Sequence, residues 1–200
     1  MKQHQTLVLA SASPSRRTLL VNAGLVVKAI PADIDEIEVR NAIEENHQDP
    51  ASLAMALADA KARDVAGRIS SAPVIGADQI LICDGERMDK APDIAHAKQH
   101  LMRLQGRTHE LISAVTVHQG NSVLWSGTDT ARLSMRAMTE VDIDRYLDRA
   151  GKVILGSVGC YHLEGKGAWL FERIEGDFFT ILGLPLLPLF KTLRRLGIVE

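Results

Sequence analysis

The sequence predicts an α/β protein in which strands alternate with helices. The first observation is a short apolar run, Leu7–Ala10, followed by Ser13-Pro14 and then by leucines at helical spacing. Serine is a favourable N-cap and proline suits the first helical position, so this stretch predicts strand, tight turn and helix. The second observation is two hairpin signals, Asp84-Gly85 and Gly120-Asn121, each lying between two runs with strand character.

The remaining elements follow from the same local signals. Strands are expected at residues 7–10, 25–30, 73–78, 79–83, 87–89, 109–118, 122–135 and 169–174. Helices are expected after the N-caps Ser13, Asp49 and Asp93, after Thr139 with Asp142 as a capping box, and after Pro185. Residues 152–167 are expected to be irregular. The strand at 73–78 is apolar and is expected to end on the carboxylate of Asp78.

Length and composition narrow the class of protein. A chain of 200 residues with 46% hydrophobic and 24% charged residues suits one globular domain, residues 1–200. The net charge of −2 argues against a general nucleic-acid binder, which normally carries a basic excess. No apolar run approaches the length of a membrane span, and we expect no signal peptide. Two cysteines form no disulfide framework, so a cytoplasmic location is expected.

The first helix carries an unusual charge pattern. Arg16 and Arg17 lie in its first turn, where the helix dipole disfavours cations. A helix N-terminus already binds anions through its free N–H groups, and arginine adds a strong grip on phosphate or carboxylate. The alternative is that both are solvated surface arginines.

Other charged residues stand singly near the ends of elements. Asp78 follows apolar residues, and a buried carboxylate there is costly unless it is paired, hydrated or bound to metal. Lys61 projects from an alanine-rich helix, and Lys90 follows a hairpin. Cations and carboxylates of this kind suit a phosphoanhydride substrate with a divalent ion, although each alone fits a structural salt bridge equally well. No P-loop, dinucleotide fingerprint, nucleophile elbow or zinc-ligand spacing is present.

The ordered set of short motifs resembles the Maf family of nucleoside triphosphate pyrophosphatases over nearly the whole chain. These motifs are residues 9–17 (Leu-Ala-Ser-Ala-Ser-Pro-Ser-Arg-Arg), 35–36 (Asp-Glu), 57–62 (Leu-Ala-Asp-Ala-Lys-Ala), 76–79 (Gly-Ala-Asp-Gln), 84–86 (Asp-Gly-Glu) with Lys90, 104–109 (Leu-Gln-Gly-Arg-Thr-His), 164–168 (Glu-Gly-Lys-Gly-Ala), and 174–177 (Ile-Glu-Gly-Asp) with 183–186 (Gly-Leu-Pro-Leu). No single motif is specific, but the series in this order is.

The resemblance implies a fold, an activity and a set of site residues. It implies an extended mixed β-sheet flanked by helices, two lobes with a central cleft, and hydrolysis of a nucleotide between its α- and β-phosphates. It also implies a divalent metal, Mg²⁺ or Mn²⁺, a cytoplasmic homodimer and a link to septum formation. The net charge and the lack of a membrane-length apolar run independently predict that the protein binds neither nucleic acid nor membrane. The family's proton-accepting aspartate falls on Asp78, and its phosphate- and metal-site residues fall on Ser11, Arg16, Glu36, Lys61 and Lys90.

The sequence departs from the commoner family pattern at positions linked to base choice. Ser15 replaces an arginine, Gln79 a threonine and Glu164 a glutamine, and residues 156–159 (Gly-Ser-Val-Gly) lack an expected acid and lysine. These changes resemble the branch that acts on 7-methyl-GTP. One hypothesis is that the Glu164 carboxylate accepts hydrogen bonds from the N–H donors on the Watson–Crick edge of guanine. The alternative is that Glu164 only forms an exposed ion pair with Lys166.

Three functional hypotheses therefore compete. The first is a metal-dependent pyrophosphatase acting on modified nucleotides. The second is a nucleotide-binding regulator of septum formation with weak or no catalysis. The third, a nucleic-acid-binding module, requires a basic face that the composition does not offer. The presence of Asp78, Lys61 and Lys90 favours the first.

Overall fold

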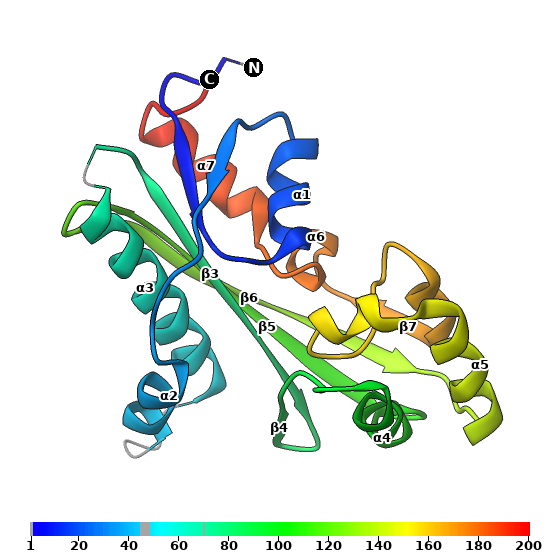
Figure 1. The fold of residues 1–200 in the computed structure, drawn as a ribbon. Helices are drawn as coiled ribbons and strands as arrows, with labels where there is room; N and C mark the ends of the chain where they lie inside the picture. The colour runs from blue at the N-terminus through cyan, green and yellow to red at the C-terminus, as the bar shows by residue number, and fades with distance from the viewer. Residues whose placement is uncertain (1, 45–48, 70) are drawn as a thin grey trace. The chain divides into compact units, whose positions relative to one another are not determined.

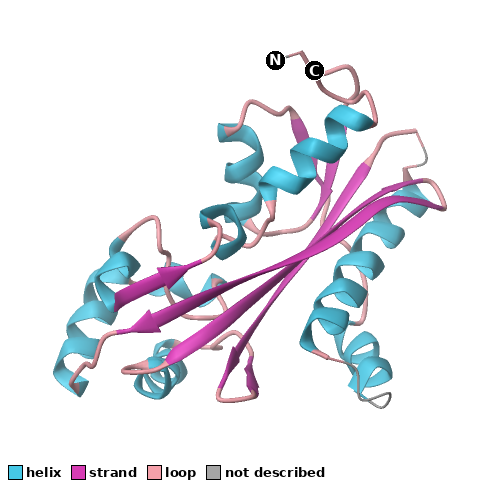
Figure 2. Cartoon of the chain, turned by 180° about the vertical axis from the view of Figure 1, so that it is seen from behind, coloured by secondary structure: helices cyan, strands magenta, loops and turns pink. Residues whose placement is uncertain are grey.

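The computed structural model describes residues 2–44, 49–69 and 71–200 and has an α/β fold (Figures 1 and 2). Its strands are β1 (Leu7–Ala10), β2 (Val27–Ala29), β3 (Val74–Cys83), β4 (Glu86–Met88), β5 (Thr108–Gln119), β6 (Ser122–Met135) and β7 (Phe171–Glu175). Its α-helices are α1 (Pro14–Asn22), α2 (Glu36–Glu44), α3 (Pro50–Arg68), α4 (Ile94–Leu104), α5 (Glu140–Ala150), α6 (Phe178–Ile181) and α7 (Leu186–Arg195). Two short 3₁₀ helices, η1 (Lys152–Gly156) and η2 (Lys166–Leu170), complete the described elements.

The strands form one mixed sheet, as the family resemblance implies. Its order is β2-β1-β3-β5-β6-β7, with β4 paired to β3. β1 lies parallel to both β2 and β3, whereas the β3–β4 and β6–β7 pairs are antiparallel. None of the described helices is long and apolar enough to cross a membrane.

The chain divides into two compact units. The first contains Met1–Gln79, Ser113–Asp129 and Phe178–Glu200, and the second contains Ile80–Ile112 and Thr130–Asp177. Each unit is described by itself.

In the first unit, β1 and β3 are buried on both faces because helices cover both sides (Figure 1). Leu7 and Leu9 of β1 pack among the apolar residues of α1 and α7. Val8 and Ala10, which point the other way, pack against α3. A strand covered on both faces has an uninterrupted apolar sequence, which explains the run Leu7–Ala10.

One glycine sets how closely α3 approaches β3. A Cβ atom added at Gly76 would lie 2.2 Å from the carbonyl oxygen of Ala58 and 2.7 Å from the Cβ of Ala62. No side chain larger than hydrogen fits there without displacing the α3 backbone. The close contact places the middle of α3 against the face of β3 that carries Val74, Gly76 and Asp78.

In the second unit, local sequence signals account for most of the elements. The Asp84-Gly85 turn has φ of 52° and 79°, the positive pair that a two-residue type I′ hairpin needs. The predicted capping box of α5 is present, with Thr139 and Asp142 bonded reciprocally. The buried ring of Tyr161 packs edge-on against Phe171, with ring centroids 4.8 Å apart. Cys83 and Cys160 are both buried free thiols.

Several predictions of element boundaries are wrong. The strand does not end at Asp78 but continues from Val74 to Cys83, because Asp78 has a partner that permits a carboxylate within a buried strand. The last predicted strand begins two residues later, at Phe171, because Trp169 belongs to η2. Residues 152–167, expected to be irregular, contain η1 and the start of η2. The helices α2 and α6 were not predicted.

Candidate active site

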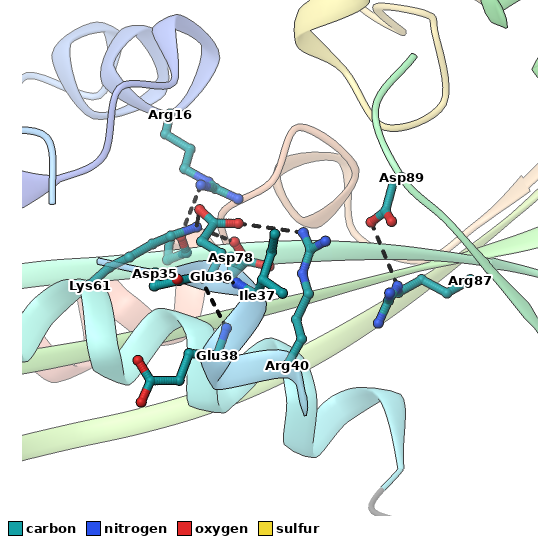
Figure 3. Close-up of polar contacts among 11 residues, drawn as sticks. Arg16, Asp35, Glu36, Ile37, Glu38, Arg40, Lys61, Asp78, Arg87 and Asp89 are labelled. Atoms are coloured by element: carbon teal, nitrogen blue, oxygen red, sulfur yellow. Dashed lines mark hydrogen bonds and ion pairs between the residues drawn. The ribbon is translucent and has the colours of Figure 1, made fainter. Parts of the chain in front are cut away.

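A partly buried cluster of charge forms where α2 and α3 meet β3 in the first unit. Figure 3 shows the Lys61 side chain reaching from α3 to two carboxylates. Its Nζ lies 2.6 Å from Oδ1 of Asp78 and 2.8 Å from Oε1 of Glu36. The side chains of Lys61 and Asp78 are only 13% and 12% exposed, whereas Glu36 is 41% exposed. The structure therefore brings together three residues that lie far apart in the sequence and that the family resemblance assigned to the site.

Glu36 is held at the start of α2 by the residue before it. Oδ1 of Asp35 accepts from the backbone N–H groups of Ile37 and Glu38, at 2.9 and 3.1 Å, as an N-cap does. Arg40, one turn later, places its Nη2 3.4 Å from Oε2 of Glu36 (Figure 3). The acidic stretch is therefore partly a capped helix start that points one carboxylate at Lys61.

Arg16 is held by three acceptors from three segments. Its Nε donates to the Gly183 carbonyl at 2.8 Å, and its Nη1 donates to the Ala77 carbonyl at 2.9 Å and to Oγ of Ser11 at 3.3 Å. Burial lowers the pKa of the Arg16 guanidinium, and the charges of Asp78 and Glu36 oppose that shift. Arginine keeps its proton in proteins, so Arg16 is a fixed cation beside the carboxylates.

The two arginines of the first helical turn differ in their surroundings. Arg16 is half-buried, whereas Arg17 is exposed. Ser13 caps the helix by accepting from the Arg16 N–H, as predicted. Ser11 is buried in the preceding turn and accepts from the Ser13 N–H at 3.2 Å. The solvated-arginine alternative therefore fits Arg17 and fails for Arg16.

The residues linked to base choice lie in different settings. Ser15 is half-buried in the first turn of α1. Gln79 follows Asp78 on β3, and its Nε2 lies within hydrogen-bonding distance of three acceptors, Ser113 Oγ and the carbonyls of Thr180 and Ile181. Neither Ser113 nor Thr180 was predicted to belong to the site, because no short-range signal marks a side chain that bonds to distant backbone.

Lys90 and Glu164 both belong to the second unit. Lys90 is exposed just after β4, and Glu164 is exposed in the turn before η2. Lys166, the alternative partner for Glu164, donates instead to the Arg149 carbonyl.

Glu36 and Asp78 suit a hard cation only if the phosphates of a bound substrate supply further oxygen ligands. Among the described residues, no group of three or more His, Cys, Asp or Glu side chains is placed to hold a metal ion. Mg²⁺, however, commonly binds through one or two protein carboxylates together with substrate phosphates and water. Glu36 and Asp78, which converge on the Lys61 ammonium, form such a pair, so the donor set fits a divalent cation that substrate phosphates help to hold.

Fold and site together define an α/β protein with a partly buried lysine–carboxylate cluster beside a fixed arginine. The sequence profile of the family described as Maf-like protein matches residues 6–196, and the chain belongs to this family. It is 48% identical over 194 residues to a protein of Rhizobium meliloti named 7-methyl-GTP pyrophosphatase, covering 97% of this chain and 98% of that protein. It is 46% identical over 189 residues to a nucleoside triphosphate pyrophosphatase of Granulibacter bethesdensis, covering 94% and 96%. A nucleoside triphosphate pyrophosphatase 1 of a Jannaschia species is 45% identical, with 96% and 98% covered.

Proposed function

We propose that this protein is a nucleoside triphosphate pyrophosphatase that hydrolyses the α–β phosphate bond, releasing a nucleoside monophosphate and pyrophosphate. The observation that carries the proposal is the Glu36–Lys61–Asp78 cluster beside Arg16, within a chain of the Maf-like family. Full-length relatives at 45–48% identity bear pyrophosphatase names, which supports the same reaction here.

In the proposed reaction, Asp78 receives a proton from the attacking water. The water oxygen bonds to the α-phosphorus, the bond from that phosphorus to the bridging oxygen breaks, and the electron pair leaves with pyrophosphate. Since Oδ1 of Asp78 accepts from Lys61, we assign the proton to Oδ2. A positioned general base of this kind contributes about 10²- to 10⁴-fold in rate.

The cations of the site are proposed to bind the phosphates. Lys61 and Arg16 offset the negative charge that develops on the leaving group, and the Ser11 hydroxyl lies beside Arg16 to donate to a phosphate oxygen. Lys90 is proposed as a further phosphate-binding residue, on the family resemblance. Glu36 and Asp78 are proposed to hold a divalent cation, Mg²⁺ or Mn²⁺, which when bound polarises the phosphoryl oxygens.

A methylated guanine nucleotide, 7-methyl-GTP, is the proposed substrate. Support comes from Ser15 and Glu164, which depart from the commoner family pattern, and from relatives named for this activity. A carboxylate accepts the adjacent N–H donors of guanine, and its negative charge favours the cationic N7-methylated base. Glu164→Gln is therefore expected to shift the ratio of kcat/KM values from 7-methyl-GTP towards UTP or dTTP, and more so with Ser15→Arg. An unchanged ratio in the double variant would place base selection elsewhere.

The reaction is tested by incubating the purified protein with a panel of nucleoside triphosphates, 7-methyl-GTP included, with Mg²⁺ or Mn²⁺. The expected products are the monophosphate and pyrophosphate in equal amounts. A diphosphate with free phosphate would reject the proposed bond, and no product from any nucleotide would favour the regulator hypothesis. We also propose a cytoplasmic homodimer that binds neither nucleic acid nor membrane, and light scattering of the purified protein tests the dimer.

A further inference from the structure

The C-terminal end of α6 is held by side chains from β3, β5 and α1, all within the first unit. We propose that Gln79 is a positioning residue that fixes the turn at residues 180–183 and, through the Gly183 carbonyl, the guanidinium of Arg16. The proposal rests on the proposed function, in which Arg16 binds phosphate. It differs from a direct role of Gln79 in reading the base.

The contacts of the Gln79 amide support this role. Its Nε2 lies 3.0 Å from Ser113 Oγ, 3.0 Å from the Thr180 carbonyl and 3.1 Å from the Ile181 carbonyl. Both carbonyls act only as acceptors, so the nitrogen of the amide must be the end that faces them. The last carbonyls of a helix lack partners within the helix, and Gln79 supplies a donor to two of them.

Further hydrogen bonds tie the same turn to β5 and β6. The buried Ser113 hydroxyl on β5 donates to the Thr180 carbonyl at 2.9 Å. The buried Thr180 hydroxyl donates to Oδ2 of Asp129 on β6 at 2.7 Å. The backbone N–H of Gly183 also donates to the Thr180 carbonyl, at 3.0 Å. The turn is therefore fixed by a connected polar network in which the Thr180 carbonyl is the shared acceptor.

Gly183 connects this network to Arg16. Its φ of 96° is a left-handed conformation that favours glycine. A Cβ atom added there would lie 3.4 Å from Arg16 Nε and 3.8 Å from Gln79 Oε1, so the residue sits between the two side chains. Its carbonyl accepts from Arg16 Nε at 2.8 Å. Movement of the turn therefore displaces the acceptor that orients the guanidinium.

The alternation of β3 separates Gln79 from the carboxylate cluster. Asp78 points towards α3 and Lys61, and the next residue of a strand points to the opposite face. Gln79 accordingly meets α6, on the side of the core formed by α1 and α7. A threonine, found here in the commoner family pattern, ends at Cγ and Oγ and is too short to make the same contacts. The glutamine of this chain therefore acts on phosphate binding for every nucleotide.

The kinetic test compares Gln79→Met, which keeps length and loses the donor, with Gln119→Met, a matched change of a half-buried glutamine at the end of β5. Loss of these hydrogen bonds is expected to raise KM for 7-methyl-GTP and for GTP alike, by about two- to tenfold. The ratio of their kcat/KM values should stay within about twofold, and Gln119→Met should leave both unchanged. A base-selective change would overturn the proposal in favour of direct base reading, and unaltered kinetics would overturn it as well.

Hydrogen exchange provides a readout that does not depend on activity. In Gln79→Met, the amides of Gly183 and Leu184, which bond to the Thr180 and Phe179 carbonyls, should exchange at least about tenfold faster, while those of β1 stay unchanged. Ser113→Ala, a milder change at the same acceptor, should act in the same direction and less than additively with Gln79→Met. Unchanged exchange at Gly183 in both variants refutes the positioning role. Absence of hydrolysis by the wild type would instead refute the proposed function and leave the exchange result to decide the role of Gln79.

Discussion

Replacing Lys61 by methionine tests the charge cluster most directly. The change keeps side-chain length and removes the ammonium that lies 2.6 and 2.8 Å from the two carboxylates. Asp78, at 12% exposure, is then left without this partner beside a second carboxylate. Removing one member of a buried ion pair costs about 3–5 kcal/mol, and because Glu36 is 41% exposed we expect the lower end, about 3 kcal/mol.

The assay is denaturant unfolding at neutral pH, followed by circular dichroism. Lys98→Met is the matched control, because Lys98 also contacts two carboxylates, with Nζ 2.7 Å from Glu140 and from Asp144. Those carboxylates are 66% and 48% exposed, so water screens the pair and the control should lose much less stability. In addition, Lys61→Met should gain more stability from added Mg²⁺ than the wild type does, because two facing carboxylates attract a hard cation.

A second substitution checks the cause of the loss. Adding Asp78→Asn to Lys61→Met removes the uncompensated buried charge, so the double variant should be more stable than Lys61→Met alone. Equal, small losses in Lys61→Met and Lys98→Met, or a double variant less stable than the single one, would show that burial of charge does not govern this cluster.

Three further predictions follow from the site and from the second unit. Asp78→Asn should remain folded, because Lys61 keeps Glu36 as a partner, and should lose about two to four decades of kcat; a stable variant with full turnover would contradict the assignment. Arg16→Ala should lower kcat/KM far more than Arg17→Ala does, because only Arg16 is held beside the carboxylates. Equal, small effects of the two substitutions would indicate that both arginines are surface charges without a role in binding. Burial lowers the pKa of His109 from about 6.5 to about 4, so as the pH falls the unfolded chain binds a proton before the folded chain does. The free energy of unfolding should therefore be unaffected by His109 above about pH 6.5 and should be about 3 kcal/mol lower at pH 4. Changing His109 and its partner Tyr161 together to phenylalanine should flatten this part of the stability–pH curve; an unchanged slope would show that other groups cause it.

Local structure in this protein follows from neighbouring residues and was therefore predictable. Ser13, Asp93 and Thr139 each accept from an N–H group three residues ahead, so their sequence positions alone locate the helix starts. Asp84-Gly85 likewise marks its hairpin, because few residue pairs adopt two consecutive positive φ angles.

The site could be predicted only in part. Residue types at Asp78, Lys61 and Arg16 indicated phosphate chemistry. The family resemblance supplied their roles and added Glu36, but nothing in the local sequence shows that Lys61 joins two carboxylates. That contact depends on the close approach of α3 to β3 at Gly76, and it joins residues 17 positions apart in the sequence.

The tertiary structure decided the questions that depend on distant partners. Asp78 looked like the end of a strand because an unpaired carboxylate is costly in a buried one, yet its ion pair with Lys61 lets β3 continue to Cys83. Arg16 and Arg17 are alike in sequence, and only the carbonyls of Ala77 and Gly183 distinguish them. The sequence by itself determined the caps, the turns and the types of charged residue, because these act within a few residues. The partner of each charge required the fold, because a buried charge is stabilised by whichever group the packing of helix on sheet brings within a few ångströms.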